Sequence, residues 1–165
     1  MDVVQIIIGA LKFVFPAYCA NAIPVLVGGG ASMDFGRTLR DGRPIFGRNK
    51  TFRGFFAGLA VGSAVGVVES YLFGYFIAFG FLVSLGALIG DLAGAFVKRR
   101  VGIPPGGLLP LVDQVDFVIG AILFSFLTPM TRSWELYVAV IIITPPVHLL
   151  TNYVAYRLKL KNNPW

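Results

Sequence analysis

Long apolar runs recur along this sequence and strongly restrict what it can fold into. A helix that crosses a bilayer needs about 20 mostly apolar residues, and such runs alternate here with basic or Gly/Pro-rich stretches. Charged residues make up only 13% of the 165-residue chain, against roughly 25% in a typical soluble domain. So few charges would not cover a soluble surface. The sequence therefore predicts an all-α integral membrane protein.

Five transmembrane helices are expected from the spacing of these runs. The first carries Pro16 and Pro24 and should be broken or kinked there, because proline removes a backbone donor and clashes with the preceding turn. The expected bounds are about Val3–Gly29, Arg53–Phe73, Tyr75–Val97, Leu111–Leu127 and Trp134–Tyr156. No internal repeat divides the chain. Residues 1–165 should therefore form a single transmembrane domain, with loops at about 31–52 and 98–110.

The basic residues predict the orientation of the helices. Twelve of the 14 Lys and Arg residues fall after the first, third or fifth expected helix: Arg37, Arg40, Arg43, Arg48, Lys50, Arg53, Lys98, Arg99, Arg100, Arg157, Lys159 and Lys161. The exceptions are Lys12 and Arg132. Because basic loops stay in the cytoplasm, we expect a multi-pass cell-membrane protein with its N-terminus outside and its C-terminus inside. The net charge of +6 then reflects topology and does not indicate nucleic-acid binding.

Asp91 lies in the last third of the third apolar run, between Leu88 and Leu92. A carboxylate at such a position costs several kcal/mol unless it meets water, a cation or a partner, so it is a candidate functional residue. A structural ion pair with a lysine or arginine is the alternative interpretation.

Asp113 and Asp116 open the fourth apolar run, three residues apart. On a helix this spacing places both carboxylates on one face. Capping of the helix N-terminus is the alternative, and it explains one Asp better than two. Together with Asp91 they form a potential three-carboxylate cluster, whose hard oxygen ligands suit Mg²⁺ bridged to substrate phosphates.

The loop after the first helix interleaves cations with Gly42, Gly47 and hydroxyl or amide side chains. Backbone amides together with Arg and Lys suit a polyphosphate, although the glycine spacing of a Walker A motif is missing. A topogenic loop that binds anionic lipid is the alternative. Because this loop, Lys98–Arg100 and the three aspartates are expected on one membrane face, the pattern favours an enzyme that uses a metal and a phosphorylated substrate.

Other polar residues are weaker candidates. His148 and Asn152 lie four residues apart on the last helix, where hydrogen bonding in helix packing is the simpler interpretation. Glu69 and Glu135 lie near the expected outer face and are interpreted as interfacial.

Two stretches resemble the phosphatidate cytidylyltransferase (CDP-diglyceride synthase) superfamily. The segment Asn49-Lys-Thr-Phe-Arg-Gly-Phe-Phe-Ala-Gly58 is similar to that family's Gly-Lys-Thr-Trp-x-Gly segment. The stretch from Gly90-Asp-Leu through Lys98-Arg-Arg to Asp113-Gln-Val-Asp116 is similar to its long C-terminal signature. Together they cover about a third of the chain, in the family's order and spacing.

The chain departs from that signature in ways that resemble the archaeal branch, the CDP-archaeol synthases. Pro104-Pro105 replaces the family's Lys-Asp, Gly94 replaces its Ser, and Gln114 stands between the last two aspartates in place of Arg. The chain is also short, with Asp41-Gly-Arg-Pro-Ile-Phe-Gly47 in the first loop and a C-terminal Asn163-Pro-Trp165.

The resemblance implies a nucleotidyltransferase of phospholipid biosynthesis that transfers CMP from CTP to 2,3-bis-O-(geranylgeranyl)-sn-glycerol 1-phosphate, with Mg²⁺. The implied catalytic residues are Asp91, Asp113, Asp116 and Lys50, and the three aspartates are the implied metal ligands. The implied nucleotide- and phosphate-binding residues are Arg43, Arg48, Asn49, Lys50, Thr51, Lys98 and Arg99. A cytidylyltransferase for phosphatidate, and a small transporter with Asp91 as its coupling carboxylate, are the alternatives.

Overall fold

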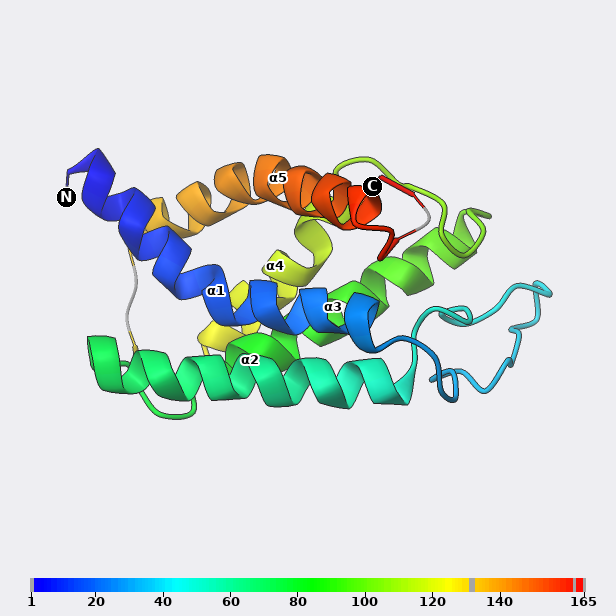
Figure 1. The fold of residues 1–165 in the computed structure, drawn as a ribbon, viewed down its shortest axis with the longest axis horizontal. Coiled ribbons are helices and arrows are strands. Elements are labelled where there is room, and N and C mark those ends of the chain that lie inside the picture. Colours follow the sequence, from blue (N-terminus) through cyan, green and yellow to red (C-terminus); the bar gives the residue numbers. More distant parts are fainter. Residues whose placement is uncertain (1, 131–132, 162, 165) are drawn as a thin grey trace.

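The computed structural model describes residues 2–130, 133–161 and 163–164. Apart from two isolated β-bridges in the first loop, the regular structure of these residues is helical (Figure 1). The helices are α1 (Val3–Val27), α2 (Phe52–Phe73), α3 (Phe79–Arg100), α4 (Val112–Ser125) and α5 (Trp134–Arg157). The all-α prediction is therefore confirmed for the described part of the chain, outside which Met1, Arg132 and Trp165 lie.

Four of these helices are long and apolar enough to cross a membrane, namely α1, α2, α3 and α5. The exception, α4, has 14 residues and is about 21 Å long, which is short of the roughly 30 Å hydrocarbon core. It ends at Ser125 rather than near Leu127. The four apolar helices support a multi-pass membrane protein. A total of five spans stays a prediction.

The first helix is bent rather than broken, and the bounds of α3 differ from the sequence prediction. The two prolines lie inside a continuous α1, which bends along its length without breaking (Figure 1). The third helix begins at Phe79, not at Tyr75, after the turn at Gly74, whose left-handed conformation (φ 68°) ends α2. It continues to Arg100, where cations interact favourably with the carbonyl end of the helix dipole.

Small residues bring the helix backbones close together. A Cβ on Gly66 of α2 would overlap the Cα of Gly80 on α3, and one on Gly86 of α3 would meet the backbone of Gly120 on α4. Such contacts are typical of membrane helices, whose association depends on close packing. The buried core lies between α1, α3, α4 and α5 and consists of Ala10, Phe13, Val14, Ala17, Phe79, Val83, Ala87, Phe117, Val118, Ala121, Leu136 and Val140.

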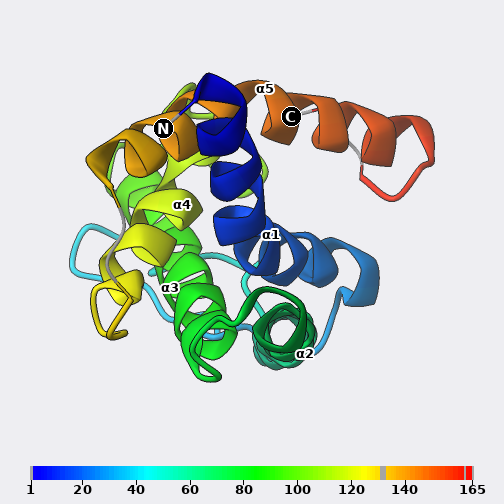
Figure 2. The same cartoon turned by 90° about the vertical axis from the view of Figure 1, so that its left-hand side faces the viewer.

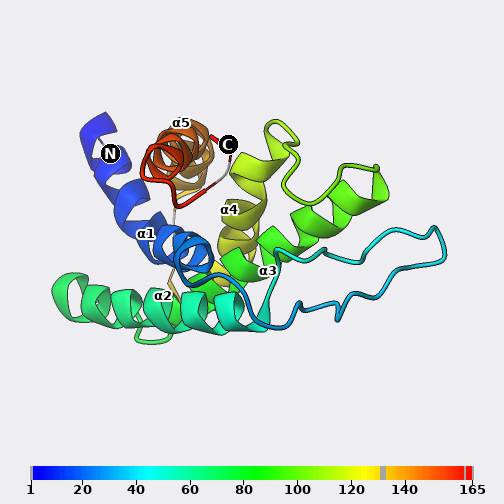
Figure 3. The same ribbon diagram turned by 45° about the vertical axis from the view of Figure 1, so that its right-hand side comes forward.

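The three basic segments gather at one end of the molecule. Figure 1 shows the α1–α2 loop, the α3–α4 loop and the C-terminal segment at the end opposite the N-terminus, and Figure 3 shows the same grouping. We call this the basic end, made of residues 28–51, 101–111 and 158–161 with the adjoining helix termini. Figure 2 looks along α2, with α1 packed above it and α3 beside it.

Candidate active site

Asp91 of α3 faces Lys50, which immediately precedes the Thr51 N-cap of α2. The Lys50 Nζ lies 2.7 Å from Oδ1 and 2.5 Å from Oδ2 of Asp91. Both side chains are about a quarter exposed, at 27% and 25%. The Thr51 hydroxyl accepts a hydrogen bond from Gly54 N–H at 3.1 Å and so caps α2. The cap fixes the direction in which the chain enters α2 and therefore where Lys50 points.

A second ion pair joins the two helices that carry the aspartates. Lys98 Nζ of α3 lies 2.7 Å from Oδ2 of Asp113 in the first turn of α4. The same oxygen accepts a hydrogen bond from Leu109 N–H at 3.1 Å. Asp113 therefore orders the chain before α4 without capping the helix N-terminus, and its charge is matched by a lysine.

Asp116 lies half-buried between α3 and α4. Its Oδ1 accepts a hydrogen bond from Phe117 N–H at 2.6 Å. Gly94 of α3 makes room for this carboxylate, because a Cβ there would overlap it. Asp116 interacts electrostatically with Asp91, Lys50 and Asp113. Asp91 and Asp113, which the sequence analysis grouped with Asp116, thus lie within electrostatic range of it, on two adjacent helices.

The carboxylates are arranged around lysines rather than around a shared centre. In the described part of the chain, no three Asp, Glu, His or Cys side chains are close enough to hold a metal ion as they stand. Asp91 and Asp113 each turn toward an ammonium group instead. The donors themselves fit Mg²⁺, since they are hard carboxylate oxygens on two adjacent helices. Mg²⁺ coordination would require Lys50 and Lys98 to give up their contacts.

Asp34, which sequence reasoning missed, organises the first loop. Its buried carboxylate (4% exposed) accepts hydrogen bonds from Gly36 N–H at 3.0 Å, Phe46 N–H at 3.1 Å and Gly47 N–H at 2.7 Å. Burial raises the pKa of Asp34, but the backbone hydrogen bonds together outweigh it and lower the pKa. An Asp two residues before a Gly is typical of an Asx turn, and that signal was available in the sequence.

Arg43 joins the first loop to the end of α3. Its guanidinium donates to the Arg100 carbonyl. Arg100 in turn forms a 2.5 Å ion pair with Asp41 and donates to the carbonyls of Arg43 and Pro44. These reciprocal contacts hold the loop over the C-terminal end of α3. The other predicted loop ligands, Arg48 and Asn49, are exposed.

Arg99 is buried beneath the first loop, with only 4% of its surface exposed. Its Cδ lies close to Gly47, which also contacts Pro105. Its Nε and Nη1 have no hydrogen-bond partner among the described residues. A buried guanidinium with unused donors is costly. The phosphate-binding role of Arg99 stays a prediction.

Lys161 is a further cation at the site that sequence reasoning treated only as topogenic. Burial lowers its pKa, as does the neighbouring Lys50, while Asp113 and Asp91 act in the opposite direction. The chain after it is tied to the second loop, because Asn163 Nδ2 donates to the Gly106 carbonyl at 3.3 Å. No local sequence pattern predicts that the C-terminal segment returns to the site.

His148 lies on the α5 side of the same region. Its ring contacts Phe117 with centroids 5.7 Å apart, and its Nδ1 lies 3.2 Å from the Asn152 amide nitrogen. The helix-packing interpretation of this pair therefore agrees with the geometry. Its electrostatic interactions with Asp113, Asp91 and Lys161 also place it beside the carboxylates.

The known proteins with similar sequences that are compared below carry the name CDP-archaeol synthase. The family model described as CarS-like, CDP-archaeol synthase, matches residues 3–165. A protein named CDP-archaeol synthase from Pyrococcus furiosus is 44% identical over 96% of this chain and 98% of its own. One from Sulfolobus acidocaldarius is 41% identical over 98% and 99%, and one from Methanopyrus kandleri is 43% identical over 94% and 91%.

A solved structure has the same fold. It is described as an intramembrane enzyme for archaeal membrane lipids biosynthesis, and it is 41% identical, with a TM-score of 0.82 over 87% of this chain and 92% of its own. The lysine–carboxylate pairs at the basic end thus lie in a fold that this enzyme shares. Since the family model and these relatives match almost the whole length, the chain belongs to the CDP-archaeol synthase family.

Proposed function

We propose that this protein is the CTP-dependent cytidylyltransferase that joins CMP to 2,3-bis-O-(geranylgeranyl)-sn-glycerol 1-phosphate. The products are unsaturated CDP-archaeol and pyrophosphate, and the reaction belongs to archaeal phospholipid biosynthesis. The observation that carries the proposal is the cluster of Asp91, Asp113 and Asp116 with Lys50 and Lys98 at the basic end. Membership of the CDP-archaeol synthase family supports the choice of nucleotide and lipid.

The reaction needs positioning and charge neutralisation more than proton transfer. An oxygen of the lipid phosphate attacks the α-phosphorus of CTP, a new P–O bond forms, and the bond to the β-phosphate oxygen breaks to release pyrophosphate. The lipid phosphate is already ionised at neutral pH, so a strong general base is not required. Fixed charges around the triphosphate lower the barrier because they stabilise the charge that shifts toward the leaving group.

The lysines are suited to receive the phosphates. Lys50 and Lys98 each hold one carboxylate when no nucleotide is bound, and each ammonium is equally able to donate to a phosphate oxygen. Arg99 contributes guanidinium donors that have no partner among the described residues. In this proposal Lys50 and Lys98 exchange a carboxylate for a phosphate as CTP enters. Arg43, Arg48, Asn49 and Thr51, in the first loop and at the start of α2, are the further proposed phosphate-binding residues.

The carboxylates left by the lysines would hold Mg²⁺. Asp91, Asp113 and Asp116 supply the oxygen ligands, directly or through water, and the ion would neutralise triphosphate charge in a site of low dielectric. Gly94 keeps the Asp116 carboxylate between α3 and α4, close to the other two. The isoprenoid chains would lie in a groove between helices, and this groove would be open to the bilayer.

The orientation proposed for the molecule is N-terminus outside, with the active site on the cytoplasmic face and α4 counted as a fifth span. It is tested by cysteine labelling in a Cys19→Ser background with a membrane-impermeant thiol reagent. Asp2→Cys should be labelled from the outer face and Arg40→Cys should not, because the first loop is proposed to be inside. The reverse pattern would exclude the orientation.

The function is tested with purified protein, labelled CTP, the diether lipid phosphate and Mg²⁺, by measuring pyrophosphate and a labelled lipid product. Product formation from the ether lipid at a higher kcat/KM than from phosphatidate supports the proposal. Preference for phosphatidate would favour the alternative lipid. The transporter alternative is not favoured by family membership, and CTP-independent uptake into vesicles without pyrophosphate release would be needed to restore it.

A further inference from the structure

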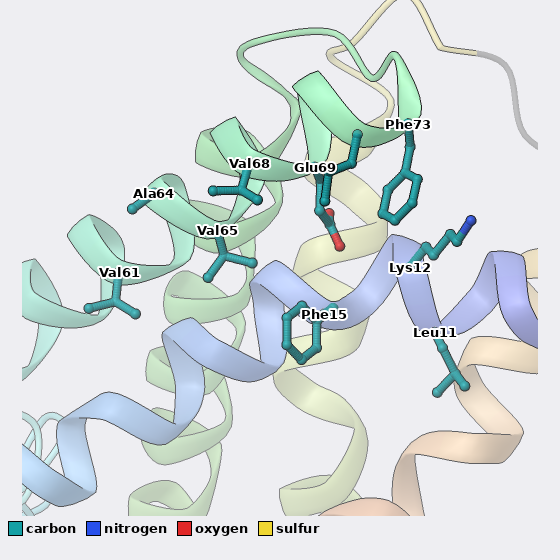
Figure 4. Close-up of a pocket in the computed structure, with 10 residues that line it drawn as sticks. Leu11, Lys12, Phe15, Val61, Ala64, Val65, Val68, Glu69 and Phe73 are labelled. Atoms are coloured by element: carbon teal, nitrogen blue, oxygen red, sulfur yellow. The ribbon is translucent and has the colours of Figure 1, made fainter.

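Glu69 of α2 lies in a groove between α1 and α2, away from the basic end. The groove has a volume of about 610 Å³ (Figure 4). Its wall is otherwise almost entirely apolar and is formed by Leu11, Lys12, Phe15, Val61, Ala64, Val65, Val68, Leu72 and Phe73. Glu69, interpreted from the sequence as interfacial, is buried within the molecule, with only 5% of its surface exposed.

The Glu69 carboxyl has an unused hydrogen-bonding atom inside this groove. Figure 4 shows the carboxyl pointing from α2 toward α1. Its Oε2 is buried and has no hydrogen-bond partner in the part of the chain that the structure describes. A buried carboxyl oxygen without a partner is costly, so the groove is chemically incomplete as it stands.

Lys12 supplies a cation at the same groove but does not complete it. Its Nζ lies 3.9 Å from the centroid of the Phe73 ring. Lys12 and Glu69 interact electrostatically, yet no ion pair joins these two described residues. The groove therefore presents one cation and one acceptor that are separate from each other, on an apolar wall.

The groove is a different place from the candidate active site. Glu69 follows Thr51 by 18 residues along the continuous helix α2, which corresponds to about 27 Å. Lys50 and Asp91 lie at the far end of that distance. A ligand in the groove would therefore not share its polar contacts with the nucleotide.

We propose that this groove binds a second membrane lipid, a phospholipid whose head group carries a hydroxyl donor. Lys12 binds the lipid phosphate, Glu69 accepts a hydrogen bond from the head-group hydroxyl, and one hydrocarbon chain lies along the wall formed by Phe15, Val61 and Val65. The site does not depend on the proposed function, because none of its residues belongs to the active site.

The chemistry of the groove selects this occupant. A hydrocarbon chain alone would leave the Glu69 oxygen and the Lys12 ammonium unmatched. A choline phospholipid would match Lys12 through its phosphate but has no hydroxyl or N–H donor for Glu69. A water-soluble anion would match Lys12 but would not cover the apolar wall. A phospholipid with a hydroxylated head group meets all three requirements at once.

The test is native mass spectrometry of the delipidated full-length protein with added phosphatidylglycerol or phosphatidylcholine of identical chains. Wild-type protein should retain phosphatidylglycerol about tenfold better, the ratio expected from one charge-assisted hydrogen bond. Glu69→Leu should reduce phosphatidylglycerol to the phosphatidylcholine level, whereas Lys12→Met should weaken both lipids. Glu135→Leu, which changes a carboxylate outside the groove, should leave the preference intact.

A second pair of variants tests the groove without altering its charges. Ala64→Trp fills the groove and should abolish lipid retention, whereas Val67→Trp, on the same helix but outside the groove, should not. Circular dichroism and gel filtration establish that each variant is folded. Equal retention of both lipids by wild-type protein, or unchanged phosphatidylglycerol retention in Glu69→Leu or Ala64→Trp, would overturn the proposal.

Discussion

The carboxylates at the two ends of this molecule have opposite surroundings. At the basic end Asp91 and Asp113 each face a lysine at 2.5–2.7 Å. At the opposite end Glu69 and Lys12 lie in one groove, where the described residues show no ion pair between them and no hydrogen-bond partner for a Glu69 oxygen. The comparison indicates that Asp91 and Asp113 are paired before any ligand arrives, so Lys50 and Lys98 must exchange partners to bind one. At the opposite end, in the proposal above, the Glu69 oxygen gains a partner only when a lipid occupies the groove.

Glycines also serve different purposes at the two ends. Gly94 leaves room for the Asp116 carboxylate between α3 and α4, whereas Gly66 allows α2 to touch the backbone of α3 at Gly80. A side chain at Gly94 would therefore disturb the candidate active site. One at Gly66 would separate two helices instead, so its effect should appear in stability.

The largest expected effect on activity comes from replacing the three aspartates at the basic end. These variants test whether the carboxylates do more than pair with lysines. Asp91→Asn, Asp113→Asn and Asp116→Asn keep the side-chain shape but remove the charge. Each should lower CTP-dependent pyrophosphate release by at least about a hundredfold, the scale reported for lost electrostatic stabilisation of a transition state. The helical circular dichroism should be retained.

Glu135→Gln is the control for these three variants, because it removes a carboxylate far from the basic end in the sequence and the fold. It should leave the rate unchanged. Near-normal rates in all three aspartate variants would exclude the metal-site hypothesis and leave Asp91 as a purely structural partner of Lys50.

A smaller effect is expected at Lys50, which both neutralises Asp91 and is proposed to bind CTP. Lys50→Ala should raise the KM for CTP and lower kcat/KM by about 10- to 100-fold, because a charge-assisted contact contributes about 1.5–3 kcal/mol. Arg40→Ala removes an exposed cation from the same loop and should have little effect. Equal kinetics of the two variants at low CTP would remove Lys50 from the nucleotide site.

The packing of the opposite end is tested by Gly66→Ala. The new Cβ would overlap Gly80, and the required shift of α2 should reduce stability by about 1–3 kcal/mol, measured as a lower unfolding midpoint in detergent. Gly9→Ala on α1 meets only Leu136 at ordinary contact distance, 3.4 Å, and should not lower it. Equal midpoints would show that α2 and α3 are not held by this contact.

The smallest expected effect concerns Asp34 in the basic-end loop. Its folded-state pKa is lowered, so the ionised carboxylate stabilises the loop above the unfolded pKa of about 4. That stabilisation is lost as the pH falls through the folded pKa. Asp34→Asn should therefore reduce hydrogen-exchange protection of Phe46 and Gly47 by about 1 kcal/mol at neutral pH. A difference from wild type that persisted at the lowest pH would argue against the charge as its source.

Much of the site was predictable because it depends on local rules. Asp113 and Asp116 were grouped by helical spacing, and Asp91 was selected because a carboxylate in an apolar run needs a partner. Asp34 and Lys161 were missed for different reasons. Asp34 has a local turn signal that was not used. Lys161 reaches the site only because the C-terminal segment folds back toward Gly106.

The sequence by itself determined the class of the protein, the gathering of cations at one end and the shared face of Asp113 and Asp116. Only the tertiary structure decided that Lys50 meets Asp91, 41 residues away, and that Glu69 is buried with no partner for its Oε2 among the residues the structure describes. Hydropathy and helical periodicity are properties of a single segment. The contacts between segments depend on how helices cross, and that follows from close packing at positions such as Gly66 and Gly80, which no periodicity within one segment specifies.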